Sequence, residues 1–483
     1  MALTIAKKKN CSDGIYFTGP AAADEVTGSQ YLIKFGDKQI LLECGLHQSN
    51  DYLESYNSNS EKFKFNPREI DYVFLNHAHI DHSGLLPRLV KEGFHGQIIT
   101  TYATAKVTEA LLHNSSYILA DEARVLSKRY SRDYMPIYTD DEVYETVDYF
   151  YIYDSYNVIY KLDENVSFKW IPNSHCIGSA QLLLILSDEN RCKKILYTSD
   201  MGSLKQKNHY LGSTEIPDDF TDITIMESTY GAKGRINKKT REFDVEHLRV
   251  AIDTVLDRQG TVILPCFSFH RTQEILTTLF EIFGSDPSFN AKIIVDSMLS
   301  CQICDIYDTI LKNENKALWS RVKSWKNVEF ISEKVDSQAC IQDDTPKIVL
   351  SSSGFCQNGR VVKYLSKYLA DENSMIIFSG FIGDDPSYLS YRIKNYKEYK
   401  TLNIAGEPIV NRADCITLST FSSHASHSDL IKFGSSLNTN KIVLVHGSQE
   451  AKQNLREELT EAISKNNHTY KVYCSTKDMV CRL

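Results

Sequence analysis

Short apolar segments separated by turns make up the first part of the chain. Residues 30–35 and 38–43 are each predicted to form a strand, and Gly36-Asp37 between them suits a β-hairpin. Beyond residue 71, an apolar strand at 72–75 leads through a histidine-rich loop into an amphipathic helix that begins near Ser83. Such alternation of strand, loop and helix predicts an α/β fold.

The same alternation returns in the middle of the chain and predicts one domain with a parallel sheet. Neither a repeat of fixed period nor a Pro- or Ser-rich linker marks its limits, so direct chain crossings are expected to join it to the rest. The segments that predict it are strands at 260–264, 293–296, 347–350 and 374–378, with helices at 271–283 and near Val361.

Composition changes this picture by excluding several classes of protein. A chain of 483 residues, 42% hydrophobic and 24% charged, with 11 prolines and 22 glycines, is globular and long enough for more than one domain. No apolar run reaches the length of a membrane span, and MALTIAKKKN lacks the apolar region of a signal peptide, so a cytoplasmic protein without a membrane partner is expected. The twelve scattered cysteines are then reduced.

Charge argues against a protein that binds nucleic acid over its whole surface. Lys and Arg total 54 against 62 Asp and Glu, for a net charge of −8. Any polyanionic partner must therefore be bound locally.

The strongest chemical signal is an H-x-H-x-D-H motif that follows an apolar strand. It contains His77, His79, Asp81 and His82, three imidazoles and a carboxylate within six residues. These are the ligand types that Zn²⁺ prefers. In an extended loop His77 and His79 point the same way, whereas Asp81 and His82 at the turn into a helix are offset, which favours two metal ions.

Two ions need more ligands than one loop provides. His175, Asp200 and His446 are candidates, because each ends or follows an apolar strand. Taken alone, each is more often a polar group at a strand end than a ligand. Together with the loop they form a plausible ligand set.

The order of these motifs resembles the metallo-β-lactamase fold, and specifically its β-CASP branch of RNA- and DNA-processing nucleases. After the histidine loop come a single histidine, an aspartate, Glu227-Ser-Thr-Tyr-Gly231, a long insert, Phe421-Ser-Ser-His-Ala425 and Leu444-Val-His-Gly447. The resemblance implies an α/β protein: an αββα metallo-β-lactamase sandwich with an inserted α/β β-CASP domain. The implied boundaries are 1–228 and 412–483 for the sandwich and 229–411 for the insert.

The resemblance also implies roles for single residues and two Zn²⁺ ions per chain, with Mn²⁺ or Fe²⁺ as alternatives. One zinc is bound by His77, His79 and His175, the other by Asp81, His82 and His446, and Asp200 bridges them. The catalytic residues are then Asp81, Glu227 and His424, with His424 beside the scissile phosphate and Glu227 orienting it. A protonated His424 beside an anionic Glu227 could donate a proton to the leaving oxygen.

Two arginines of the insert are implied to bind substrate. Arg271 begins a predicted helix within an R-x-Q-E motif, where backbone N–H groups and the guanidinium could meet a phosphate. Arg360 lies in a glycine-rich turn. The chain departs from the family at Glu43, where aspartate is usual, and at His270, where glycine is usual.

Three functions remain open on the sequence. The favoured one is a zinc-dependent phosphodiesterase that hydrolyses single-stranded RNA as an endoribonuclease, with exonuclease activity and DNA cleavage as variants. The second is a two-metal hydrolase of a small ester, thioester or phosphodiester. The third is a nucleic-acid-processing scaffold subunit with weak catalysis, whose usual sign is missing ligands. A homo-oligomer remains open.

Overall fold

The computed structural model describes residues 13–205, 208–233, 239–383 and 385–483. The amino-terminal residues on which the expected localisation rests lie outside these ranges. The chain divides into two compact units. The first comprises Met1–Lys205, Ser213–Ile236 and His424–Leu483, and the second comprises Gln206–Gly212 and Asn237–Ser423.

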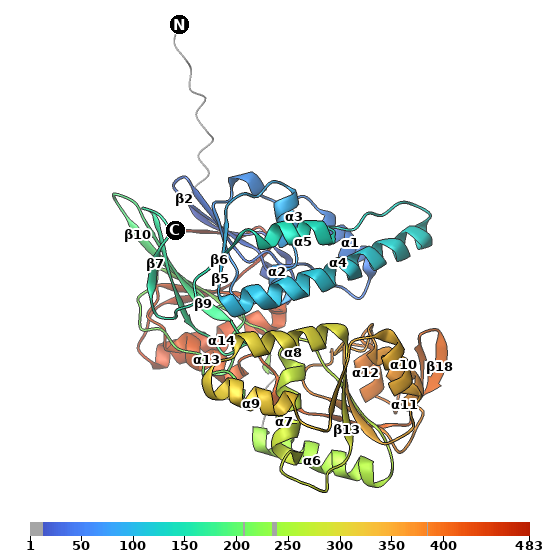
Figure 1. The fold of residues 1–483 in the computed structure, drawn as a ribbon. Helices are drawn as coiled ribbons and strands as arrows, with labels where there is room; N and C mark the ends of the chain where they lie inside the picture. The colour runs from blue at the N-terminus through green and yellow to red at the C-terminus, as the bar shows by residue number, and fades with distance from the viewer. Residues whose placement is uncertain (1–12, 206–207, 234–238, 384) are drawn as a thin grey trace. The chain divides into compact units, whose positions relative to one another are not determined.

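The first unit is built on two seven-stranded sheets (Figure 1). In spatial order, the first sheet contains β22 (Val480–Arg482), β1 (Gly14–Phe17), β2 (Tyr31–Phe35), β3 (Lys38–Leu42), β4 (Tyr72–Phe74), β5 (Gln97–Thr100) and β6 (Phe150–Ile152). The second contains β21 (Lys471–Cys474), β20 (Lys441–Val445), β11 (Ile223–Glu227), β10 (Cys192–Tyr197), β9 (Ala180–Ser187), β8 (Val166–Pro172) and β7 (Ile159–Lys161).

Three apolar cores arrange these sheets in four layers. One core lies between the sheets, where Phe74 of β4 packs with Phe168 and Trp170 of β8. The outer face of the first sheet packs on α1 (Tyr52–Ser60), α3 (Leu86–Lys91), α4 (Tyr102–Tyr130) and α5 (Asp140–Val147) (Figure 1). The outer face of the second sheet packs on α13 (His427–Ser435) and α14 (Gln449–Lys465). The predicted αββα sandwich is confirmed.

Strand direction gathers several loops at one edge of the second sheet. Both β8 and β10 run antiparallel to β9, and β10, β11 and β20 are mutually parallel. The carboxyl ends of these four strands therefore share an edge. In the first sheet β3 and β4 are likewise parallel, so the loops that follow them start side by side.

The second unit is built on a six-stranded parallel sheet whose central strands are buried, as expected when helices cover both faces. Its spatial order is β14 (Val328–Ile331), β13 (Lys292–Asp296), β15 (Lys347–Ser351), β12 (Val262–Pro265), β16 (Met375–Phe378) and β19 (Asp414–Thr417). The helices are α6 (Arg241–Asp257), α7 (Arg271–Phe283), α8 (Met298–Ile310), α9 (Asn313–Lys323), α10 (Lys334–Gln342), α11 (Val361–Tyr368) and α12 (Leu389–Lys394), and β17 (Thr401–Ile404) pairs with β18 (Glu407–Val410).

Both limits of the insert and the start of one helix differ from the sequence expectations. The second unit continues to Ser423 rather than ending at 411, because β19 pairs with β16 and so completes the sheet of that unit. Its longer segment begins at Asn237, beyond the expected boundary at 229, and its short segment, Gln206–Gly212, precedes that boundary. The helix expected near Ser83 begins earlier, with α2 (Ile80–Ser83), and α3 follows it.

None of the helices within the described residues combines the length and apolar character needed to cross a bilayer.

Candidate metal centre and active site

The histidine motif is placed by the end of β4 and the start of α2. His77 lies in the loop after β4, His79 is the residue that caps α2, and Asp81 and His82 fall in the single turn of that helix. The loop and the helical turn therefore direct two pairs of donors to different positions, as the sequence predicted.

A first group of donors surrounds one side of Asp200. His77, His79, His175 and Asp200 each offer a ligand atom, and these atoms lie within 4.8 Å of one another. Asp200 Oδ2 is 3.7 Å from both His77 Nε2 and His175 Nε2, and His175 Nε2 is 3.1 Å from His79 Nδ1.

A second group surrounds the other side of Asp200. Ligand atoms of Asp81, His82, Asp200 and His446 also lie within 4.8 Å of one another. Asp200 Oδ1 is 3.4 Å from His82 Nε2 and 3.1 Å from His446 Nδ1, whereas Asp81 Oδ2 is 3.3 Å from His446 Nε2. Asp200 is thus shared by the two groups through different oxygens, so the seven residues predicted as ligands come together.

These donors fit divalent transition metals. Each group offers four donor residues, with imidazole nitrogens and carboxylate oxygens as ligand atoms. Zinc prefers these donor atoms and four-coordinate tetrahedral geometry. His77 donates or accepts a hydrogen bond through Nδ1, 3.0 Å from Ser199 Oγ, while its Nε2 is fully buried without a hydrogen-bond partner among the described residues. A buried nitrogen left in this way is costly unless a ligand meets it.

Protonation in the first group also suits metal binding. Burial lowers the pKa of His77 well below its ordinary value and the pKa of His79 to about 4. Both side chains are therefore neutral at pH 7, which is the form of imidazole that binds a metal.

The second group places two carboxylates beside its histidines, and each kind of group shifts the pKa of the other. Burial alone would raise the pKa of Asp200, but His446 and His82 hold it well below its usual range. Burial would lower the pKa of His82, yet the carboxylates of Asp200 and Asp81 raise it well above its ordinary value. The two carboxylates thus attract positive charge, which a metal ion can supply in place of a proton.

Three further side chains orient the histidines, and two of them gave no signal in the sequence. Ser199 Oγ lies 3.0 Å from His77 Nδ1 and donates to Glu43 Oε1 at 3.0 Å, while Glu43 Oε1 is 3.6 Å from His82 Nδ1. Thr229 Oγ1 lies 3.1 Å from His446 Nδ1. Such outer contacts fix the ring orientation of metal-binding histidines. In the sequence, Glu43 stands out only as a departure from aspartate.

Glu227 and His424 form a pair beside this centre. His424 Nδ1 is 3.2 Å from Glu227 Oε1, and His424 Nε2 is 4.0 Å from Asp200 Oδ2. The Glu227 carboxylate is held by the backbone N–H groups of Met201 and Thr229, which donate to its two oxygens at 2.8 Å and 3.0 Å. Burial acts to lower the pKa of His424, but the charges of Glu227 and Asp200 outweigh it and raise the pKa to about 9. At neutral pH His424 is therefore an imidazolium.

The two predicted substrate arginines occupy different surroundings within the second unit. Arg360 Nη1 donates to the fully buried Asp296 at 2.7 Å and to the carbonyl of Ile331 at 3.1 Å, and Nη2 donates to the carbonyl of Ser332. These contacts give Arg360 a structural role, and its contact with substrate stays a prediction. Arg271 begins α7, as predicted, and its Nη2 is 3.3 Å from Ser423 Oγ.

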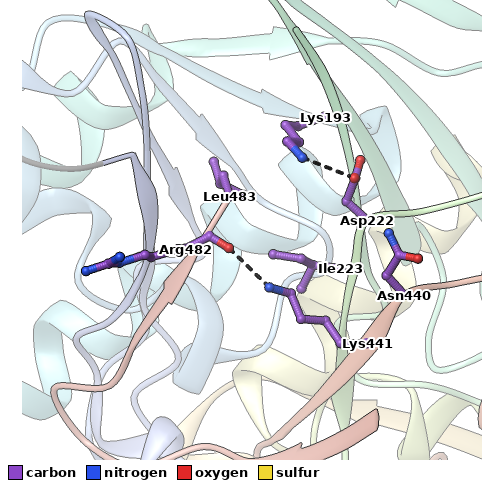
Figure 2. A pocket seen from close by; sticks show the side chains of 7 residues that line it. All are labelled: Lys193, Asp222, Ile223, Asn440, Lys441, Arg482 and Leu483. Atoms are coloured by element: carbon purple, nitrogen blue, oxygen red, sulfur yellow. Dashed lines mark hydrogen bonds and ion pairs between the residues drawn. The ribbon is translucent and has the colours of Figure 1, made fainter. Parts of the chain in front are cut away.

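A cavity of about 180 Å³ lies elsewhere in the first unit and does not belong to this centre. Its walls include Lys193, Ile223 and Lys441, which stand at the amino ends of β10, β11 and β20 (Figure 2). Asp200 and His446 instead follow the carboxyl ends of β10 and β20, at the opposite edge of the sheet. Lys193 pairs with Asp222 at 3.3 Å, and Lys441 donates to the carbonyl of Arg482 at 3.1 Å (Figure 2).

Comparison with known proteins agrees with this geometry. Residues 23–143 match the model of the metallo-beta-lactamase superfamily, residues 272–385 match the Beta-Casp domain, and residues 409–471 match the Zn-dependent metallo-hydrolase RNA specificity domain. The fold and the ligand groups define a metal-dependent hydrolase of the metallo-β-lactamase superfamily. Within it, the chain belongs to the β-CASP branch, because the Beta-Casp match falls inside the inserted unit.

Relatives cover nearly the whole chain. It is 28% identical to Ribonuclease TTHA0252 of Thermus thermophilus over 435 residues. This alignment covers 89% of this chain and 92% of that protein. It is 24% identical over 455 residues to cleavage and polyadenylation specificity factor subunit 3-I of Arabidopsis thaliana, an alignment that covers 92% of this chain and 61% of that protein. It is 25% identical over 479 residues to endoribonuclease ysh1 of Schizosaccharomyces pombe, which corresponds to 96% of this chain and 58% of that protein. The chain thus spans less than two thirds of these two eukaryotic relatives.

A solved structure supports the fold alone. A protein of unknown function from Enterococcus faecalis V583 superposes with a TM-score of 0.54 at 15% identity, over 98% of this chain and 100% of that one.

Proposed function

We propose that this protein is a two-metal phosphodiesterase that hydrolyses RNA as an endoribonuclease. The observation that carries the proposal is the pair of donor groups that share Asp200, next to an imidazolium held by Glu227. The scaffold alternative loses its usual support, because none of the seven predicted ligand positions is vacant or replaced.

The proposed ligands are His77, His79 and His175 for one ion and Asp81, His82 and His446 for the other, with Asp200 between them. Two zinc ions held by these residues would activate water at neutral pH and would neutralise charge on a phosphoryl group. Asp81 and Asp200 contribute carboxylates that remain ionised, since the pKa of each is lowered by neighbouring histidines despite burial.

His424 is the proposed general acid. Hydrolysis of a phosphodiester leaves an alkoxide, and a proton delivered to that oxygen as the bond to phosphorus breaks stabilises it. The Glu227 carboxylate at 3.2 Å from Nδ1 holds the imidazole ring and its charge. Backbone N–H groups in turn fix Glu227, so the pair does not depend on solvent for its geometry.

RNA is the proposed substrate, on the strength of similarity. The matched family description names an RNA specificity domain, and the relatives are named as a ribonuclease, an endoribonuclease and a cleavage and polyadenylation factor. The acidic net charge of −8 agrees with local rather than general binding of a polyanion.

The test combines metal analysis with cleavage of labelled strands. Protein loaded with zinc, manganese or iron is assayed by elemental analysis and by digestion of RNA and DNA of the same sequence, labelled at one end or the other. Two equivalents of metal and internal RNA fragments from both labels are expected. Less than one bound equivalent, or hydrolysis of small esters without cleavage of RNA, would overturn the proposal.

A further inference from the structure

Four aromatic rings meet at the carboxyl edge of the parallel sheet in the second unit. Phe267 follows β12, Phe355 follows β15 and Phe381 follows β16, while Tyr388 immediately precedes α12. These three strands are neighbours in the sheet. Open parallel sheets bind ligands outside the carboxyl ends of their strands, so this aromatic cluster occupies the usual position of a binding site.

Phe355 is the hub of the aromatic cluster. Its ring centroid lies 5.3 Å from Phe267 with an interplanar angle of 86°, 6.1 Å from Phe381 at 87°, and 5.1 Å from Tyr388 at 55°. Edge-to-face packing of this kind stabilises the cluster without covering every ring face. Phe267 is 46% exposed, although Pro265 and Cys266 just before it are buried.

The exposed ring is held rigidly. The Phe267 carbonyl accepts hydrogen bonds from Thr272 N at 3.2 Å and Thr272 Oγ1 at 2.8 Å. Gly354 lies against the ring, since a Cβ atom at Gly354 would come within 3.0 Å of it. Ser390 N donates to the Phe355 carbonyl at 3.3 Å, which ties the hub to α12. Single exposed apolar side chains are common on protein surfaces, but Phe267 is nearly half exposed while its backbone and ring are fixed by neighbours, so it offers a preformed contact surface.

A cation lies next to the cluster. A Cβ atom on Gly380, the neighbour of Phe381, would be 3.9 Å from Arg271 Nη2. A planar ring with a guanidinium nearby suits a ligand that has an aromatic face and a negative charge. A nucleotide of an unpaired strand has both.

Resting on the proposed function, we infer that Phe267, backed by Phe355, is a stacking platform for a nucleobase of single-stranded nucleic acid. The ring accepts any base, because stacking reads the aromatic face rather than the hydrogen-bonding edge. It selects for unpaired strands, because the bases of a duplex present their faces only to one another.

The test measures binding to zinc-loaded, full-length protein with a 2′-O-methyl oligonucleotide, chosen because the modified sugar resists cleavage. Fluorescence anisotropy gives the affinity, and single abasic positions are walked along the strand. F267A is expected to lower the affinity about ten-fold, within the range of one stacked base, whereas F267Y keeps a ring and stays within about two-fold of wild type. F243A is the matched control, because Phe243 is 54% exposed on α6 of the same unit.

The abasic series identifies stacking specifically. At one position of the strand, loss of the base is expected to lower the affinity of the wild type by the same factor as the F267A substitution lowers it for the intact strand. The F267A variant should bind this abasic strand and the intact strand equally well. An affinity unchanged in F267A, as a docking surface for a protein would give, overturns the inference. So does a loss in F267A that is equal at every abasic position. If the wild type neither binds nor cleaves RNA, the proposed function has failed instead.

Discussion

The two units each gather side chains at the carboxyl ends of parallel strands, but they gather opposite kinds. In the first unit, β10 and β20 lead to Asp200 and His446, and β11 ends in Glu227; all three side chains are at most 3% exposed. In the second unit, the strands β12 and β15 lead to Phe267 and Phe355, with Phe267 directed to solvent. One edge is built to hold ions and protons, and the other to offer a surface.

The difference shows how burial divides the work of a hydrolase. Buried carboxylates and imidazoles interact strongly because little water screens them, and their protonation is set by their neighbours. Exposed rings act through contact area and need no fixed charge. We therefore expect substitutions at the first edge to abolish chemistry, and those at the second to change binding or stability.

The largest effect is expected from D200N, which keeps the size of the side chain but removes the charge shared by both donor groups. Metal content should fall from two equivalents to less than one, and RNA cleavage should fall to the background of the assay. Elemental analysis after gel filtration measures the first, and digestion of labelled RNA the second. A variant that kept both ions would show that Asp200 does not bridge them.

H424A should separate catalysis from metal binding. The metal content should stay at the wild-type level while kcat falls by about 10² to 10⁴, the usual contribution of a general acid. Loss of metal would instead make His424 a ligand, since it also lies within reach of Asp200. An unchanged kcat would remove it from the mechanism.

The pH profile should report the same residue. The wild type needs protonated His424, whose pKa is about 9, so kcat should fall as the pH rises through about 9. H424A should lack this alkaline limb. E227Q removes the charge that raises the pKa, so the limb should move to lower pH. If the limb is the same in wild type and H424A, another group titrates there.

A smaller effect is expected from the residues that orient the ligands. S199A removes contacts to His77 and Glu43, and T229A removes the contact to His446. Each should weaken metal affinity by about 10- to 100-fold in a competition with a chelator. S199A should release the ion of the first group more readily, and T229A that of the second. Identical release from both would mean that the two groups do not bind independently.

The smallest effect on chemistry is expected at Arg360. R360Q leaves the buried Asp296 without its cation, so the free energy of unfolding of the second unit should fall by about 2–3 kcal/mol. This value is at or below the usual cost of breaking a buried ion pair, because Arg360 is partly exposed. R271Q, which removes the contact to Ser423, is the comparison and should leave the melting temperature nearly unchanged while raising KM for RNA. Calorimetry and steady-state kinetics distinguish the two, and equal melting temperatures would contradict the structural role of Arg360.

The sequence located the cluster of metal-binding side-chain types better than it located the side chains that support them. His77, His79, Asp81 and His82 are close along the chain, and the others follow apolar strands, so strand pattern and donor type located them. Ser199 and Thr229 are common residue types whose role depends on contacts 122 and 217 residues away, which no local pattern encodes.

The same limit explains Arg360 and the domain boundary. The partner of Arg360, Asp296, is 64 residues away, so the sequence could not show that this guanidinium was already engaged. The strand β19 joins the sheet of the second unit by pairing with β16. The β17–β18 hairpin separates these two strands along the chain, so the sequence does not reveal that they pair. Strands and helices of the second unit were otherwise predicted closely, including α7 at Arg271–Phe283, because their apolar pattern is local.

The shared metal centre has a consequence for synthesis. His446 lies 365 residues beyond Asp81, and the second unit is translated between them. A ribosome that adds about 5–20 residues per second therefore needs roughly 20–70 s to pass from one ligand to the other. Throughout that time the nascent chain has an incomplete second donor group. A chain released before residue 446 lacks one of the proposed ligands of the second group, so the proposed centre is complete only after the second unit has been made.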